Sequence, residues 1–154
     1  MPQKKNEEEA ERWFLQARYD LKAALWNRDG GFYDTACFLS QQSAEKAFKS
    51  LLYYQGHRRK LLSHSVVELV KHAKDSIPTI DLLLEAARKL DIHYMPSRYP
   101  NGLPSGYPHQ FYSKETSEEA IKNAKMLLEA VDAFYRQRNC TFTEEEGEEQ
   151  EVEQ

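Results

Sequence analysis

The sequence has few of the features that mark secreted, membrane or disulfide-rich proteins. Its 154 residues include two cysteines, Cys37 and Cys140, which are too few and too far apart for a disulfide framework. No apolar run approaches the roughly 20 residues that a membrane-spanning helix needs. The N-terminal stretch also lacks the apolar core of a signal peptide, so we expect a cytoplasmic protein that does not associate with membranes.

Signatures of metal and cofactor binding are also missing. The five histidines never stand at the i, i+4 spacing of a helical zinc site, and the cysteines are isolated. There is no Gly-x4-Gly-Lys-Ser/Thr loop and no Gly-x-Gly-x-x-Gly after a strand. The Gly-Ser followed by an Asp-x-Asp pair of a nucleotidyltransferase is absent too. We therefore expect no metal, no cofactor and no nucleotidyltransferase chemistry in this chain.

Apolar residues recur at helical spacing over five stretches, and no useful length alternates with a period of two. The stretches are residues 6–27, 32–55, 66–74, 76–90 and 116–135. The first two are long and separated only by a short glycine-containing break, so they should form an antiparallel hairpin. The sequence therefore predicts an all-α bundle.

Three local patterns predict helix ends. Ser65 with Glu68, and Thr116 with Glu119, match the capping box that starts a helix. Gly56 stands where a C-terminal cap of the second helix belongs.

Charge is distributed unevenly along the chain. The net charge is −4, but residues 140–154 hold seven Glu and no Lys or Arg, which leaves +3 on residues 1–139. Runs of like charge with little apolar content do not form packed cores. We therefore expect one helical domain over residues 1–139 and an acidic, disordered tail over residues 140–154.

The segment 88–108, RKLDIHYMPSRYPNGLPSGYP, gathers side chains suited to phosphate binding, base stacking and proton transfer. Its prolines at positions 96, 100, 104 and 108 forbid regular helix. Connections in compact domains usually take about 4–6 residues, so a longer ordered loop is often functional. The alternative is a surface loop whose tyrosines only cover the core.

The middle of the second helix is unexpectedly polar. Gln41, Gln42, Glu45 and Lys46 interrupt an otherwise apolar stretch, and polar groups there must find partners or face solvent. One interpretation is that Gln41 and Glu45 form an outward polar stripe. The other is that this face is buried, against a second subunit or holding the proline-rich loop through amide hydrogen bonds.

Three motifs, in this order, resemble the HEPN family of nucleotide-binding helical domains. They are residues 33–47 (YDTACFLSQQSAEKA), residues 63–65 (SHS) and residues 94–100 (YMPSRYP), the last followed by a helix with acidic residues and alanine. The resemblance covers roughly residues 8–137. It implies an up-and-down antiparallel bundle of four long helices plus one short helix, usually as a homodimer. It also implies a role beside a nucleotidyltransferase partner, as in toxin–antitoxin pairs.

Ribonuclease members of that family carry an Arg-x4–6-His pair, and two pairs in this sequence fit. Arg88 with His93 is the first choice and Arg59 with His64 the second. Such a site would be a metal-independent endoribonuclease that leaves 2′,3′-cyclic phosphate ends, with histidine moving protons and arginine holding the phosphate. In an unbroken helix Arg88 and His93 would point about 140° apart. Tyr94 also follows His93 directly, which departs from the family's His-x-Tyr pattern.

A second hypothesis is binding without catalysis. Arg98 can hold a phosphate while Tyr94, Tyr99 and Tyr107 stack on bases, as in single-stranded nucleic-acid recognition. The structural alternative is that Arg98 pairs with a carboxylate and Tyr99 packs on the bundle. The sequence thus favours a nucleotide- or RNA-binding toxin–antitoxin component. An endoribonuclease and a non-catalytic dimerisation module remain open.

Overall fold

The computed structural model describes residues 2–142, and all regular structure in this part of the chain is helical. The α-helices are α1 (Pro2–Asp29), α2 (Tyr33–Tyr54), α3 (Val66–His72), α4 (Ile80–Asp91), α5 (Pro108–Phe111) and α6 (Lys114–Gln137). Two short 3₁₀ helices, η1 (Arg58–Leu62) and η2 (Pro100–Gly102), lie in the connections. The predicted all-α class is confirmed. Among these residues no helix is long and apolar enough to cross a membrane.

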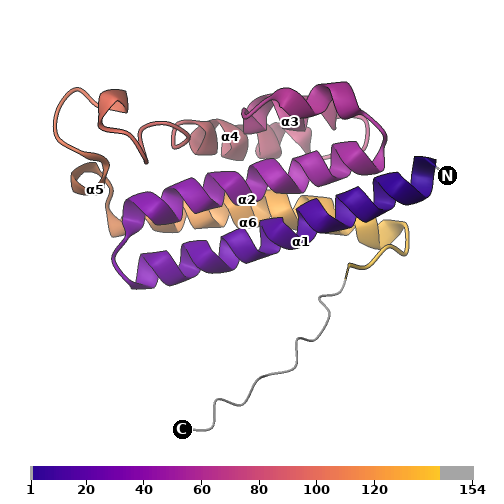
Figure 1. Ribbon diagram of the computed structural model, residues 1–154, viewed down its shortest axis with the longest axis horizontal. Helices are drawn as coiled ribbons and strands as arrows, with labels where there is room; N and C mark the ends of the chain where they lie inside the picture. The colour runs from indigo at the N-terminus through magenta and orange to yellow at the C-terminus, as the bar shows by residue number, and fades with distance from the viewer. Residues whose placement is uncertain (1, 143–154) are drawn as a thin grey trace, which may run out of the picture.

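Helix α2 is the central element of the bundle (Figure 1) and contacts α1, α3, α4, α5, α6 and η1. The four long helices, α1, α2, α4 and α6, alternate in direction, and the short α3 packs on α4. This is the predicted architecture, with α5 as an additional single turn. The loop carrying η2 and α5 lies at the end of the bundle where α1 turns into α2 (Figure 1).

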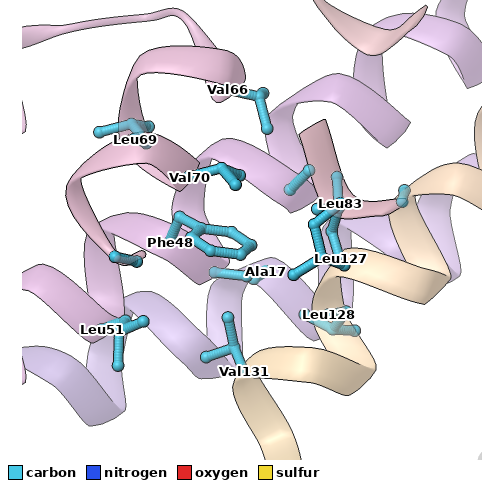
Figure 2. Packing of buried hydrophobic residues seen from close by; sticks show 14 of the residues in the cluster. Ala17, Phe48, Leu51, Val66, Leu69, Val70, Leu83, Leu127, Leu128 and Val131 are labelled. Atoms are coloured by element: carbon cyan, nitrogen blue, oxygen red, sulfur yellow. The ribbon is translucent and has the colours of Figure 1, made fainter. Parts of the chain in front are cut away.

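The hydrophobic core forms around the inner face of α2. Figure 2 shows Phe48 of α2 among Ala17 of α1, Val70 of α3 and Leu127 of α6, all of them buried. Alanines on α1 and α2 let these two helices approach closely. Ser43 donates to the carbonyl of Ala17 at 2.7 Å, a bond that reaches across the helix pair. Burial of this stripe, rather than helix propensity, stabilises the long helices.

Two glycines end the first two helices as expected. Gly31 adopts φ +83° in the turn after α1, and Gly56 adopts φ +76° after α2. At Gly56 the amide donates to the Tyr53 carbonyl at 3.0 Å, and the His57 amide donates to the Leu52 carbonyl at 2.9 Å. This pair of bonds is a Schellman motif, in which glycine takes the left-handed position without a Cβ clash.

Helix α3 is capped from two directions. Ser65 accepts from the Glu68 amide at 3.2 Å, which confirms the predicted cap. Asp91, at the end of α4, accepts from the Ser65 hydroxyl at 2.7 Å and from the amides of Val66 at 2.6 Å and Val67 at 3.3 Å. A carboxylate is favourable at a helix N-terminus, where backbone N–H groups lack partners. Asp91 thereby joins the start of α3 to the end of α4.

Two predicted helix starts were wrong. Helix α6 begins at Lys114, not near Thr116, because Ser113 is its cap and accepts from the Thr116 amide at 3.2 Å. Helix α4 begins at Ile80, after Pro78, which disfavours helical angles in the residue before it.

The prolines of the loop were also expected to exclude helix throughout. Pro100 and Pro108 instead open η2 and α5, at the first helical position, where proline's missing N–H costs nothing.

Packing against the bundle continues past the predicted boundary at residue 139, although α6 ends at Gln137. Phe142 is buried against Phe14 and Tyr135, with ring centroids 5.9 and 4.7 Å away, and its carbonyl accepts from Arg18 at 2.6 Å. The remainder of the predicted acidic tail, residues 143–154, lies outside the described residues.

Removing the Phe142 ring should therefore destabilise the bundle. For Phe142→Ala we expect a loss of roughly 2–4 kcal/mol in the free energy of unfolding, measured by urea denaturation, because a buried ring leaves a cavity between two aromatic neighbours. Thr141→Ala, at the exposed neighbouring position, is the matched control and should change stability by less than about 0.5 kcal/mol. Equal stability of the two variants would contradict this packing.

Candidate functional site

The polar residues of α2 face inward. Gln41 is fully buried, Glu45 is 4% exposed and Lys49 is also buried. The outward polar stripe considered from the sequence is therefore wrong for Gln41 and Glu45. Buried polar groups must be satisfied within the protein, and their partners bring the next part of the chain to this face of α2.

Glu45 is the common acceptor of this buried group. One of its carboxylate oxygens lies 3.3 Å from the Lys49 ammonium, and the other lies 3.3 Å from His64 Nδ1. Gln41 donates to the same carboxylate at 3.4 Å and to the His64 carbonyl at 3.2 Å. The amide of Gln41 thus holds the segment after η1, not the proline-rich loop.

His64 connects the buried group with the surface. Its ring stacks on Tyr94 with centroids 5.1 Å apart and planes inclined by 14°. A carboxylate can only accept a hydrogen bond, so the contact with Glu45 selects a proton on Nδ1. In the neutral ring Nε2 then has a lone pair, and the side chain is 58% exposed. Accessible imidazole with a fixed tautomer can accept a proton from a ligand hydroxyl.

Tyr94 also belongs to an arginine–aromatic cluster, which is formed by Phe38, Tyr94, Arg98 and Tyr99. The Arg98 guanidinium carbon lies 4.3 Å from the ring centroid of Phe38, 4.6 Å from that of Tyr94 and 4.9 Å from that of Tyr99. Arg98 Nε donates to the Tyr94 carbonyl at 2.9 Å, and Nη2 makes a weak contact with the Met95 sulfur at 3.8 Å. Within residues 2–142 no carboxylate pairs with Arg98.

The remaining predicted tyrosines are on the surface. Tyr99 is 45% exposed at the rim of the cluster, and Tyr107 is exposed immediately before α5. Helix α5 is held to α2 by His109, whose Nδ1 lies 3.2 Å from Asp34. The structure therefore brings Tyr94, Arg98 and Tyr99 together with His64.

The first-choice pair, Arg88 and His93, is arranged differently. His93 Nδ1 lies 3.1 Å from the Tyr112 hydroxyl, and burial lowers the pKa of the imidazole, with the Glu119 carboxylate opposing this effect. Burial also raises the pKa of Tyr112. Arg88 is exposed on α4 and, among the described residues, makes no hydrogen bond or ion pair with His93. His93 is thus half-buried beside Tyr112, whereas His64 is accessible.

The second-choice pair is also separated in its contacts. Arg59 is exposed in η1 and lines a shallow cavity of about 390 Å³ with Gly56, His57 and Arg58. His64 instead contacts Glu45 and Tyr94, as described above.

Sequence reasoning missed Phe38, Glu45 and Lys49 as members of the site. The signal available was the spacing of these residues, since positions 38, 45 and 49 lie on one face of a helix. No group of three or more His, Cys, Asp or Glu side chains in the described part of the chain is placed to hold a metal ion.

The chain is thus a small helical-bundle protein with buried polar residues on its central helix, α2. A model of the "HEPN domain" family matches residues 10–134. The chain belongs to the HEPN family, and the resemblance drawn from its three motifs is confirmed.

Known proteins with similar sequence or structure are consistent with this family assignment. TT1696 from Thermus thermophilus is 34% identical with a TM-score of 0.73, over 81% of this chain and 97% of that one. ST0689, described as an archaeal HEPN homologue, is 37% identical with a TM-score of 0.66, over 80% and 95% of the two chains. The Methanocaldococcus jannaschii protein "Putative toxin MJ1304" is 28% identical over 136 residues, 84% of this chain and 90% of that protein.

The lowered pKa of His93 predicts acid sensitivity. An unfolded histidine titrates near pH 6.5, so the unfolded chain binds the proton more readily than the folded one. The contribution of His93 to stability is therefore full above about pH 6.5 and is lost as the pH falls below it. We expect His93→Gln to flatten the decline of unfolding free energy between about pH 7.5 and 5, measured by urea denaturation. His57→Gln, at an exposed position, should keep the wild-type slope. An unchanged slope in His93→Gln would argue against a desolvated imidazole.

Proposed function

We propose that this HEPN domain binds RNA or a nucleotide through the arginine–aromatic cluster, with Arg98 as the phosphate ligand. The observation that carries the proposal is the guanidinium held among three rings, 4.3–4.9 Å from their centroids, without a carboxylate partner in the described residues. Its Nε is engaged by a backbone carbonyl, which orients the fork. Oriented arginine binds phosphate in two-point fashion, which lysine does not reproduce.

Tyrosines supply the base contacts in this proposal. Tyr99 is 45% exposed beside Arg98, and Tyr107 is exposed on the same loop. Aromatic rings bind bases of any sequence by stacking, at roughly 1–3 kcal/mol per base. Tyr94 is already stacked on His64 and contacts Arg98, so its role in this proposal is to position the guanidinium.

We also propose a toxin-like role with a nucleotidyltransferase as the antitoxin partner. The similarity to the Methanocaldococcus jannaschii protein named "Putative toxin MJ1304" supports the first part. The second part rests on the resemblance to family members paired with nucleotidyltransferases. Nucleotidyltransferase chemistry would come from that partner, because this sequence lacks its motif.

A second candidate function is metal-independent RNA cleavage, and the exposure of His64 favours this histidine over His93. His64 Nε2 would take the proton of the RNA 2′-hydroxyl as its oxygen attacks the adjacent phosphorus. The departing 5′-oxygen would take a proton from solvent water, and the imidazolium would return its proton to solvent, giving a 2′,3′-cyclic phosphate and a 5′-hydroxyl. Glu45 would position the imidazole, and Arg98 would stabilise the phosphate charge.

Substitutions in the cluster test binding. Arg98→Ala and Tyr99→Ala should each weaken affinity for a labelled RNA by about 1–3 kcal/mol, measured by fluorescence anisotropy. Arg98→Lys should not restore it. Arg88→Ala, at an exposed arginine in the last turn of α4, is the control. A larger effect of Arg88→Ala than of Arg98→Ala would move the phosphate site to α4.

Histidine variants, incubated with RNA and EDTA, distinguish binding from cleavage. If His64 carries protons, His64→Ala should lower cleavage by roughly 10²–10⁴-fold while binding persists. His93→Ala should leave most activity in place. Cleavage that depends on His93 and Arg88 instead would identify that pair as the catalytic residues. If no RNA is cleaved in EDTA, only the binding function remains.

We propose that the protein acts as a two-fold symmetric homodimer, the commonest closed assembly. The supporting observation is the amount of large apolar side chain left on the surface, with Leu62, Leu82 and Ile92 all exposed. Sedimentation at tens of micromolar should give twice the chain mass of 18.0 kDa. A monomer under these conditions would rule out the dimer and with it the dimerisation-module alternative.

A further inference from the structure

A groove of about 430 Å³ lies between α1 and α2. It is lined by Glu9, Arg12, Trp13, Gln16, Lys46 and Tyr53. One wall is a pair of stacked rings, Trp13 and Tyr53, with centroids 5.6 Å apart and planes inclined by 30°. Both rings are only partly buried. A groove with an aromatic wall and a polar rim suits a flat, hydrogen-bonding ligand such as a nucleobase.

The groove is linked to the arginine–aromatic cluster by the buried charges of α2. Lys49 lies 5.7 Å from the centroid of the Trp13 ring and 3.3 Å from the Glu45 carboxylate. Glu45 in turn contacts His64, which stacks on Tyr94 of the cluster. The two sites are therefore the ends of one continuous chain of contacts.

Both sites lie on one stripe of α2. Phe38, Glu45, Lys49 and Tyr53 follow each other at intervals of seven, four and four residues, which keeps them on roughly one side of a helix. From Phe38 beneath Arg98 to Tyr53 in the groove, the helix rises by about 22 Å. One mononucleotide is too short for this distance, whereas a strand of several nucleotides reaches from one end to the other.

The groove also contains one cationic side chain that could exchange its carboxylate partner for a phosphate. Arg12 is 75% exposed and pairs with Glu9 at 2.7 Å, and surface pairs of this kind are weak. Lys46 is held at 2.5 Å by the largely buried Asp20. Arg12 is thus the cation in this groove that can change partners when a phosphate arrives.

We propose that the ligand is an extended single strand of RNA that lies along α2. It would contact Arg98 at one end and stack a base on the Trp13–Tyr53 wall at the other. This inference rests on the proposed RNA-binding function and extends it, since it names the ligand as single-stranded and several nucleotides long. A duplex fits poorly, because its paired bases do not present their faces to a stacking wall.

The test compares a labelled 12-nucleotide single strand, the same sequence as a duplex, and a labelled mononucleotide, by fluorescence anisotropy on the full chain. Trp13→Ala should weaken binding of the single strand by roughly 5- to 150-fold and leave mononucleotide binding unchanged. Trp26→Ala is the matched control, because Trp26 is 82% exposed near the other end of α1. Arg12→Ala, an exposed position that should not affect folding, should lower the salt dependence of strand binding.

Tryptophan emission gives an independent reading. The chain has two tryptophans, so Trp26→Phe leaves Trp13 as the only one. The 12-nucleotide strand should quench its emission, whereas the mononucleotide should not.

The outcomes separate the two levels of the proposal. If Arg98→Ala weakens binding but Trp13→Ala and Arg12→Ala do not, the cluster binds RNA and the path along α2 is wrong. If the wild-type protein binds neither strand nor mononucleotide, both proposals fail. Stronger binding of the duplex than of the single strand would also overturn the inference.

Discussion

The buried carboxylate of Glu45 is the constraint on which the functional face depends. A charge removed from water is costly unless it is paired and hydrogen-bonded. In this fold the Glu45 carboxylate is compensated by the Lys49 ammonium, one turn later on the same helix, and by the His64 ring from the segment after η1. The amide of Gln41 donates to the His64 carbonyl and so holds that segment in place. Satisfying one buried charge thus places an accessible imidazole at the surface and, through ring stacking, sets the position of Tyr94.

The bundle supports this arrangement by enclosing α2 with helices that approach it closely. Alanines and serines of α1 and α2 shorten the distance between their backbones, as the Ser43 bond to the Ala17 carbonyl shows. The groove lies where α1 packs on α2, and the arginine–aromatic cluster lies where Phe38 of α2 meets the loop after α4.

The sequence was sufficient for what depends on local patterns. Helical periodicity predicted the long helices, and Gly56 and Ser65 were recognised as caps because each acts within one turn of its helix. Ser113 was overlooked because the later Thr116 offers the same type of pattern. The site was harder, since His64 and Tyr94 are 30 positions apart and meet only through packing. The spacing of Arg88 and His93 matched a motif, but spacing does not report side-chain direction, and burial beside Tyr112 decided the environment of His93.

The carboxylate of Asp91 has a consequence for the motions of this domain. Because it accepts from the first residues of α3 while it ends α4, neither helix end can fray without losing the same bonds. The two helices and the start of the long loop therefore form one cooperative unit for subglobal opening. Amide hydrogens of Val66 and Val67 would exchange with solvent at the rate at which this whole unit detaches from α2 and α6, and the start of the loop after α4 would become mobile in the same event.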